Sequence, residues 1–388
     1  MDDIEKKVLK EKINIKHRVN LAKLRSDYFL RKVFNNLQKN LSLELVKYNK
    51  KIQKRLNINI NNYKDYSELY TPIEIELIPI KNENGKFINL KNKKEYYHIY
   101  FDNKKEEINR NYITKEDEIN KIIIIIDYQI KSFEDLFDNC ICIESISFKK
   151  FYRNNIIDMS GMFSGCSSLK DVNFSSFNTS NVIYMRYMFN GCSSLNYLNL
   201  SNFNTNNVKD ISEMFSLCIS LKELDLSNFN TTNVTDMKYI FYKCSSLKMV
   251  NISNFDTNNV VNMVGMFYQC AALTELNISN FDTTHVTNMC GMFYGCSSLT
   301  ELNITNFDTH NVIYMVDMFR ECSSLKELNL SNFNFSNVKD MEAIFFDCSS
   351  LKELNISNFD RLIFIDIDFM FHGCSDELKN KILSKIRK

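Results

Sequence analysis

One sequence phrase recurs every 26 residues through most of the chain, and this repeat constrains the fold more than any other feature. Its clearest mark is cysteine, which occupies ten equally spaced positions from Cys140 to Cys374, each preceded three residues earlier by a phenylalanine. A fixed period of about 20 to 50 residues is typical of solenoids, in which each unit contacts only its neighbours. We therefore expect residues 133–375 to form one stack of similar units.

Each unit combines two periodicities. From Val182 to Cys192 apolar residues recur at spacings of three and four, which predicts a short helix. From Leu195 to Leu200 they follow the pattern Leu-x-x-Leu-x-Leu, whose last two leucines alternate as in a strand. A loop rich in Asn and Thr around Phe203 completes the unit. The predicted order is helix, bend, strand and loop.

Stacking follows from the small core of a single unit. Burying about eight apolar side chains at roughly 2 kcal/mol each does not offset the cost of ordering a whole unit, at about 1 to 2 kcal/mol per residue. Parallel strands lie about 4.8 Å apart, whereas packed helices need about 8 to 10 Å. We therefore predict an α/β repeat solenoid of the leucine-rich-repeat type, with parallel strands on its concave face and short helices on its convex face, preceded by a helical and β-rich extension.

The predicted core of the solenoid contains a double column of phenylalanine and cysteine. Free cysteine is readily buried, and no histidine or carboxylate recurs in step with the cysteines, as a metal site would require. We interpret the column as buried thiols, with disulfides or metal sites along the stack as the alternative. The core residues are Phe163, Cys166, Phe189, Cys192, Phe215, Cys218, Phe241, Cys244, Phe267, Cys270, Phe293, Cys296, Phe319, Cys322, Phe345 and Cys348.

The first part of the chain differs in charge from the rest. Residues 1–60 contain sixteen Lys or Arg and six Asp or Glu, so they carry about +10 while the remainder carries about −9. Leu30, Phe34 and Leu37 keep helical spacing, which predicts a basic helical hairpin. The sequence contains neither a signal peptide nor a window apolar enough to span a membrane, which favours an intracellular location.

Alternation of polar and apolar residues in 70–128 predicts a small β-rich connector that ends in a capping strand. We expect that strand, Ile122–Ile126, to pair with the first repeat strand, Ser145–Phe148, and to close the near end of the solenoid. Residues 376–388 begin after Ser375 with acids in the first turn and predict a capping helix at the far end.

The repeat phrase also identifies a family. The form Met-Phe-x-x-Cys-Ser-Ser-Leu-x-x-Leu-x-Leu-Ser-x-Phe-x-Thr-x-Asn-Val-x-x-Met, recurring every 26 residues over 133–375, closely resembles the BspA-like leucine-rich-repeat proteins, known for the bacterial surface protein 26-residue repeat. The resemblance implies a repeat scaffold without catalysis, used to bind host or matrix proteins at a cell surface. The chain departs from bacterial surface members because it has no leader, no lipoprotein cysteine near the start and no wall anchor.

A second, weak similarity concerns the N-terminal helices. Residues 30–37, together with Leu45, Val46 and Leu56, are similar to an F-box, the helical module that docks substrate receptors onto ubiquitin ligases. The leading Leu-Pro and the usual tryptophan of that family are missing here. The alternative is an amphipathic hairpin that covers another surface.

Strand positions that point away from the core form the candidate binding surface. Glutamate recurs in one column and asparagine in the next, which predicts an acidic strip for a protein ligand. Tyr197 and Met249 interrupt the glutamate column, and we expect them to be anchors because binding energy concentrates in a few large residues. In the alternative, stacked asparagine amides bond to one another and only seal the face. The candidate residues are Tyr197, Asn199, Glu223, Asp225, Met249, Asn251, Glu275, Asn277, Glu301, Asn303, Glu327, Asn329 and Glu353.

One thiol stands outside the cysteine column of the regular repeats. Cys290 follows His285 by five residues, so a nucleophile and a base can be imagined. The equivalent position holds unrelated residues in the other repeats, and no third orienting residue is evident. Variation of a surface position explains Cys290 better than catalysis does.

These observations favour a non-enzymatic protein-interaction scaffold that binds a protein ligand on the concave strand face. The alternatives are an F-box-like substrate receptor of a ubiquitin ligase and a cell-surface adhesin. We expect no metal, cofactor or catalytic residue, a monomeric protein, and no transmembrane segment. Nucleic acid is disfavoured as a partner, although the basic N-terminus would be the part to tether the chain to a polyanion.

Overall fold

The structure is a computed structural model that describes residues 26–36, 49–59, 61–63, 71–91, 94–102, 104–357 and 367–386. The chain divides into two compact units, Met1–Thr71 and Pro72–Lys388. The helices are α2 (Asp27–Asn36), α4 (Lys50–Leu56), α6 (Ile367–Met370) and α7 (Asp376–Ile386), and the 3-10 turns are Lys94–Tyr96 and Lys115–Asp117. The strands are β1 (Ile73–Pro79), β2 (Gly85–Lys86), β3 (His98–Phe101), β4 (Tyr112–Ile113), β5 (Ile122–Ile126), β6 (Ile143–Lys150), β7 (Asp171–Asn173), β8 (Glu223–Asp225), β9 (Met249–Asn251), β10 (Glu327–Leu330) and β11 (Glu353–Ile356).

The first unit contains the helix pair α2 and α4. Leu30 and Ile52 are buried against each other, and the side chain of Asn49 accepts a hydrogen bond of 3.1 Å from the Ile52 N–H at the start of α4. Part of the F-box similarity, at Leu37, Leu45 and Val46, lies outside the described residues.

The second unit begins with a sheet whose strand order is β3-β5-β1-β6-β7. The prediction that residues 122–126 pair with the first repeat strand is wrong, because β1 lies between β5 and β6 and is antiparallel to both. Alternate residues of β1, from Ile73 to Leu77, are fully buried. The apolar face of this strand therefore packs into the core, while its two edges pair with β5 and β6. The strand that closes the near end of the repeats is therefore β1.

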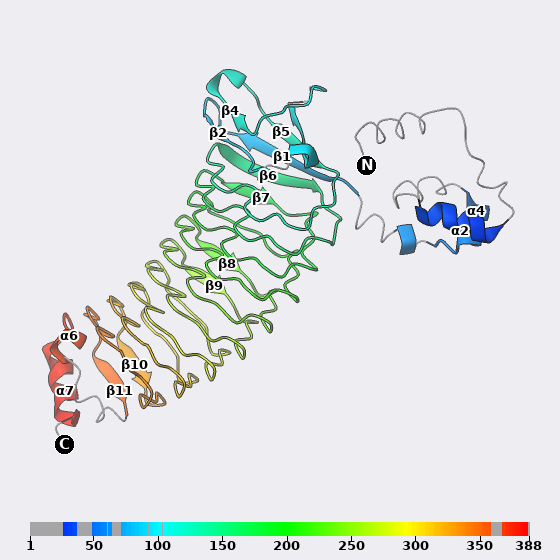
Figure 1. Ribbon diagram of the computed structural model, residues 1–388. Helices are drawn as coiled ribbons and strands as arrows, with labels where there is room; N and C mark the ends of the chain where they lie inside the picture. Colours follow the sequence, from blue (N-terminus) through cyan, green and yellow to red (C-terminus); the bar gives the residue numbers. More distant parts are fainter. Residues whose placement is uncertain are drawn as a thin grey trace. The chain divides into compact units, whose positions relative to one another are not determined.

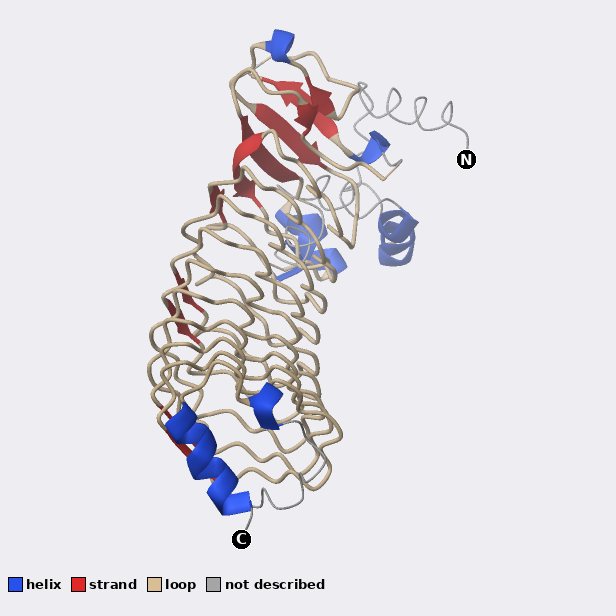
Figure 2. Cartoon of the chain, turned by 90° about the vertical axis from the view of Figure 1, so that its left-hand side faces the viewer, coloured by secondary structure: helices blue, strands red, loops and turns tan. Residues whose placement is uncertain are grey.

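From β6 onward the backbone forms stacked coils, each one repeat unit long (Figures 1 and 2). β6 pairs in parallel with β7, the first strand of the next coil. Eight parallel bridges then join residues that are 26 positions apart, beginning with Ser132 to Asp158 and ending with Tyr314 to Asp340. We call the side that carries these bridges the turn side, and the side that carries β7 to β11 the strand face.

The prediction of a helix in each repeat is wrong for the coils of residues 133–357, because their turn side is built of tight turns; only the last repeat has a short helix there, α6. In the coil from Met185 to Cys192, the N–H groups of Tyr187, Phe189 and Gly191 bond to carbonyls of the next coil at 2.8 to 3.0 Å. The N–H of Cys192 bonds to the carbonyl of Phe189, three residues earlier, at 3.1 Å. Tyr187 and Gly191 have φ values of 58° and 72°, in the left-handed region, which a right-handed helix excludes.

This correction also affects the predicted curvature. The reasoning for concave strands required helix spacing on the opposite side, yet coils on the turn side are hydrogen-bonded to each other as neighbouring strands are. Rings of the repeated phenylalanines stack with centroids 5.2 to 5.9 Å apart, well below the spacing of packed helices. Helix packing therefore supplies no reason for the stack to bend towards its strands.

The strand face has the expected register but interrupted ladders. The described strands of the repeats pair as β6 with β7, β8 with β9, and β10 with β11, and equivalent residues such as Glu223 and Met249 lie opposite each other. Along β8 the pattern is exposed, buried, exposed, so Leu224 points inward while Glu223 and Asp225 face out. This alternation places the candidate residues on the surface.

Threonine side chains fasten each loop to the next. Thr231, which is buried, donates a hydrogen bond of 2.8 Å from its hydroxyl to the carbonyl of Asp256 and accepts one of 2.8 Å from the N–H of the same residue. Thr179, Thr205, Thr257, Thr283 and Thr309 make the same pair of bonds. Phe335 occupies the equivalent position in the following coil and is buried instead.

At the far end, α7 packs its apolar side on the stack. The Leu378 N–H donates a hydrogen bond of 3.3 Å to the hydroxyl of Ser375, which caps the helix. Leu378 and Ile382 are buried in the same core as the repeats. Residues 358–366, including Phe359, lie outside the described residues, and beyond them Phe371 and Cys374 continue the phenylalanine and cysteine columns.

Candidate functional site

The strand face exposes all thirteen candidate residues. Their exposure follows from the alternation within each coil, in which the intervening leucine, isoleucine or valine points inward. Carboxylates and amides therefore form two parallel columns that run from coil to coil, as the sequence predicts. Two large hollows lie along them.

The first hollow brings both predicted anchors together. Tyr197 is 64% exposed and Met249 is 50% exposed, and both line a hollow of about 590 Å³. Glu223, Asp225 and Glu275 line the same hollow, and no described Lys, Arg or His lines it. The hollow therefore combines two large apolar contacts with net negative charge.

The second hollow, of about 580 Å³, lies farther along the same columns. It is lined by Glu301, Glu327 and Glu353, with Asn303 and Asn329 beside them. Lys381 of α7 also lines it, so this end of the strand face is partly neutralised by the capping helix. Sequence reasoning did not foresee this lysine because nothing local indicates that α7 reaches the strand face.

The asparagine column uses its oxygens locally. The side-chain oxygens of Asn199, Asn251 and Asn277 accept hydrogen bonds of 3.0 to 3.3 Å from the backbone N–H two residues later, as in Asx turns. Asp225 replaces asparagine in this column, and its pKa is lowered mainly by the Ser227 N–H, with a further contribution from Asn251. These asparagine oxygens therefore stabilise the turn that follows each strand. In the alternative, stacked amides would instead use their oxygens to bond to one another.

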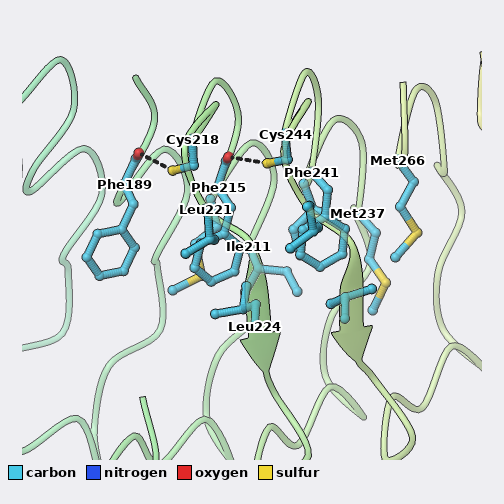
Figure 3. Packing of buried hydrophobic residues seen from close by; sticks show 14 of the residues in the cluster. Phe189, Ile211, Phe215, Cys218, Leu221, Leu224, Met237, Phe241, Cys244 and Met266 are labelled. Carbon is cyan, nitrogen blue, oxygen red and sulfur yellow. Dashed lines mark hydrogen bonds between the residues drawn. The ribbon is translucent and has the colours of Figure 1, made fainter. Parts of the chain in front are cut away.

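The cysteine column forms a second, buried hydrogen-bond series (Figure 3). The Cys218 thiol lies 3.2 Å from the carbonyl oxygen of Phe189 in the previous coil, and the Cys244 thiol lies 3.0 Å from that of Phe215. The Phe189 oxygen also accepts the Cys192 N–H, so one carbonyl joins two coils. Each core phenylalanine and cysteine predicted from the repeat is fully buried.

Burial determines the chemistry of these thiols. It raises the pKa of Cys218 and Cys296 to about 12, because the thiolate would have to form away from water. The described cysteines are free thiols. Within the described ranges, no group of three or more His, Cys, Asp or Glu is arranged to hold a metal ion.

Cys290 and His285 have separate surroundings and do not form the nucleophile and base pair considered above. The His285 ring nitrogen Nδ1 lies 2.8 Å from the carbonyl oxygen of Asn258, in the position where asparagine side chains bond in neighbouring coils. Cys290 is half-buried, and desolvation raises the pKa of its thiol. A raised pKa disfavours the thiolate that a nucleophilic mechanism requires.

The turn side carries an aromatic column that sequence reasoning missed. Tyr242, Tyr268 and Tyr294 stack with centroids 4.9 and 4.3 Å apart, and Arg320 continues the stack between Tyr294 and Phe346. Each of these residues directly follows the repeated phenylalanine, so position in the repeat is the signal that could have revealed it. The ring faces cover one another, and we therefore interpret the column as a packing feature.

The comparisons with known proteins agree with the repeats. A family model described as "Mycoplasma protein of unknown function, DUF285" matches residues 131–248, 200–277, 218–302 and 265–385. The chain belongs to this family. Overlapping matches are what a repeated DUF285 phrase produces, and together they extend from the coil before β6 to α7.

The family description assigns no function to DUF285 proteins. No curated protein matches the chain. No helix in the described part of this DUF285 protein has both the length and the apolar character needed to cross a membrane.

Proposed function

We propose that this DUF285 protein is a non-enzymatic scaffold of the BspA-like leucine-rich-repeat type, and that its strand face binds a protein ligand. The observation that carries the proposal is the first hollow, where Tyr197 and Met249 are exposed among Glu223, Asp225 and Glu275. Tyr and Met are enriched at protein interfaces, and most of the binding energy comes from a few large side chains surrounded by a polar rim.

The form of the surface also supports binding to a macromolecule. The two hollows are open and lie along one continuous row of coils. Stacked units present an extended surface of this kind, which suits a polypeptide better than a small substrate. Hydrogen bonds from the cysteine and threonine side chains join neighbouring coils. They hold the binding surface in one conformation before a ligand arrives.

Site-specific photo-cross-linking of the full chain in the source cell tests the proposal. A photoreactive residue at position 197 should capture a protein adduct, while the same residue at Tyr314 should not. Tyr314 is a matched control because it lies on the turn side and is 42% exposed. The adduct at position 197 should be lost in a Met249→Ala, Glu275→Lys double variant.

Two results would overturn the proposal. One is that positions 197 and 314 capture the same proteins to the same extent. The other is that the double variant keeps the adduct of position 197 unchanged, since the hollow would then not select its partner. Circular dichroism of each variant checks that the stack is intact.

A further inference from the structure

Chemically similar side chains recur at every second coil in the first hollow. One strand position holds Asp171, Tyr197, Glu223, Met249 and Glu275 in five successive coils. The order is therefore acid, aromatic, acid, apolar, acid. Tyr197 also lines a smaller adjoining hollow with Asp171, so the alternating series runs through both.

The spacing of this series selects among peptide conformations. Neighbouring strands lie about 4.8 Å apart, so acids in every second coil are about 10 Å apart. Three residues of a polyproline II helix advance about 9.3 Å and return to the same side. A β-strand returns to the same side after about 6.7 Å, which does not match the spacing of the acids. A ligand with a period of three residues therefore fits the series.

The asparagine column favours a ligand whose backbone carbonyls are unsatisfied. The oxygens of Asn199 and Asn277 are bound to backbone N–H groups of their own turns, so the NH₂ group is the part of each amide that can bind a ligand acceptor. A polyproline II segment has no internal hydrogen bonds, and its carbonyls need such donors. An α-helix bonds its own carbonyls and gains less from this column.

Charge determines which side chains such a ligand needs. Among the described residues, the first hollow is lined by three carboxylates and by no cation, and Lys222 and Lys248 do not line it. Cations spaced three residues apart would lie opposite Glu223 and Glu275. The residues between them would lie over Met249. Polyproline II segments dock in aromatic-lined grooves, and Tyr197 supplies an aromatic ring in the same hollow.

We propose that the first hollow binds a polyproline II segment with Lys or Arg at every third residue and apolar residues, such as proline, between them. This inference rests on the proposed function and specifies its partner. Because the contacts are exposed ion pairs and a few apolar anchors, the affinity is modest and falls as salt screens the charges.

A direct binding assay tests this partner. A fluorescent peptide of four Lys-Pro-Pro triplets is titrated onto the full chain at low ionic strength, followed by anisotropy. Saturable binding is expected, weakened about tenfold by a Glu223→Gln, Glu275→Gln double variant. The matched control, Glu83→Gln with Glu342→Gln, removes two exposed carboxylates that line neither hollow and should leave the affinity within about twofold.

Control peptides separate the period from the charge. A peptide of the same composition with its lysines adjacent should bind at least about fivefold more weakly, and so should a helical alanine-based peptide with lysine at every seventh residue. Equal binding of all three peptides, or of the two double variants, would overturn the inference. If cross-linking at position 197 still captures a partner whose contact segment lacks this period, the scaffold proposal stands and only the inference fails.

Discussion

The burial of each thiol in the cysteine column between two coils determines its reactivity. Cys218 is fully buried and bonded to the Phe189 carbonyl, and burial raises its pKa to about 12. At pH 8 a thiol with such a pKa is almost entirely protonated. Alkylating reagents act on the thiolate, so these cysteines are chemically silent in the folded protein.

We therefore expect iodoacetamide at pH 8 to modify Cys290 before any cysteine of the column, because Cys290 is only half-buried. Peptide mass spectrometry after brief labelling measures this order. In urea all sites should react, which shows that the reagent is competent. Native labelling of Cys218 or Cys244 as fast as Cys290 would contradict the assignment of a closed interior.

Backbone conformation at single positions gives a second prediction. Gly191 has φ of 72°, and a Cβ placed there would meet its nearest neighbour at an ordinary 3.5 Å, so only the conformation opposes a side chain. Gly191→Ala should therefore cost about 1 to 2 kcal/mol of unfolding free energy. Leu217, the equivalent residue of the next coil, has φ of 61° and is partly exposed, and Leu217→Gly should lose much less or gain stability.

Urea unfolding of the two variants, compared with the unaltered chain, measures this difference. The two substitutions form a matched pair because they lie at the same repeat position and have opposite chemistry. A loss for Leu217→Gly as large as that for Gly191→Ala would show that packing, rather than the left-handed conformation, governs the position.

At the scale of elements, the loops are joined by side chains as much as by backbone. The hydroxyl of Thr257 both donates to the Asp282 carbonyl and accepts from the Asp282 N–H. Thr257→Val keeps the shape but leaves both backbone groups without that partner, at a cost of roughly 1 to 3 kcal/mol. Thr257→Ser keeps the hydroxyl and should cost less than half as much, by urea unfolding. Equal losses for Val and Ser would mean that the methyl group, and not the hydroxyl, matters.

The sequence predicts the elements of one repeat unequally. The period and the inward and outward alternation around Leu224 follow directly from side-chain chemistry. The turn segment has the sequence pattern of a helix because two consecutive turns also place apolar residues three and four apart, as from Met185 to Cys192. Seven of the eight glycines have positive φ. Six of these lie in the regular coils, at two repeat positions four residues apart, and this recurrence of glycine in the sequence indicates turns.

Contacts between distant segments were harder to predict. Several segments before the repeats alternate in the same way, so nothing in their residues decides whether β1 or β5 lies beside β6. The first hollow was partly predictable because Tyr197 and Met249 interrupt a regular column. The position of Lys381 in the second hollow could not be predicted, because it depends on where α7 packs, and the local sequence does not determine that.

At the scale of the whole molecule, the second unit is a closed body with β1 protecting the edge of the first coil. We expect residues 72–388 to fold without the first unit. This fragment should remain monomeric because the edge of β6 stays paired with β1. A fragment of residues 131–388 lacks β1, exposes the edge of β6 and should self-associate. Light scattering during size-exclusion chromatography distinguishes the two. A monomeric 131–388 fragment with an intact spectrum would show that β1 is dispensable as a cap.

The carbonyl of Phe189, which accepts one bond from its own coil and one from the next, is reproduced along the stack. Adjacent units therefore meet through the same backbone and thiol contacts at junction after junction. In-frame duplication or loss of one complete copy in the gene would lengthen or shorten the platform while every junction stayed correct. A deletion of a single codon, by contrast, would put all later copies out of phase with their neighbours.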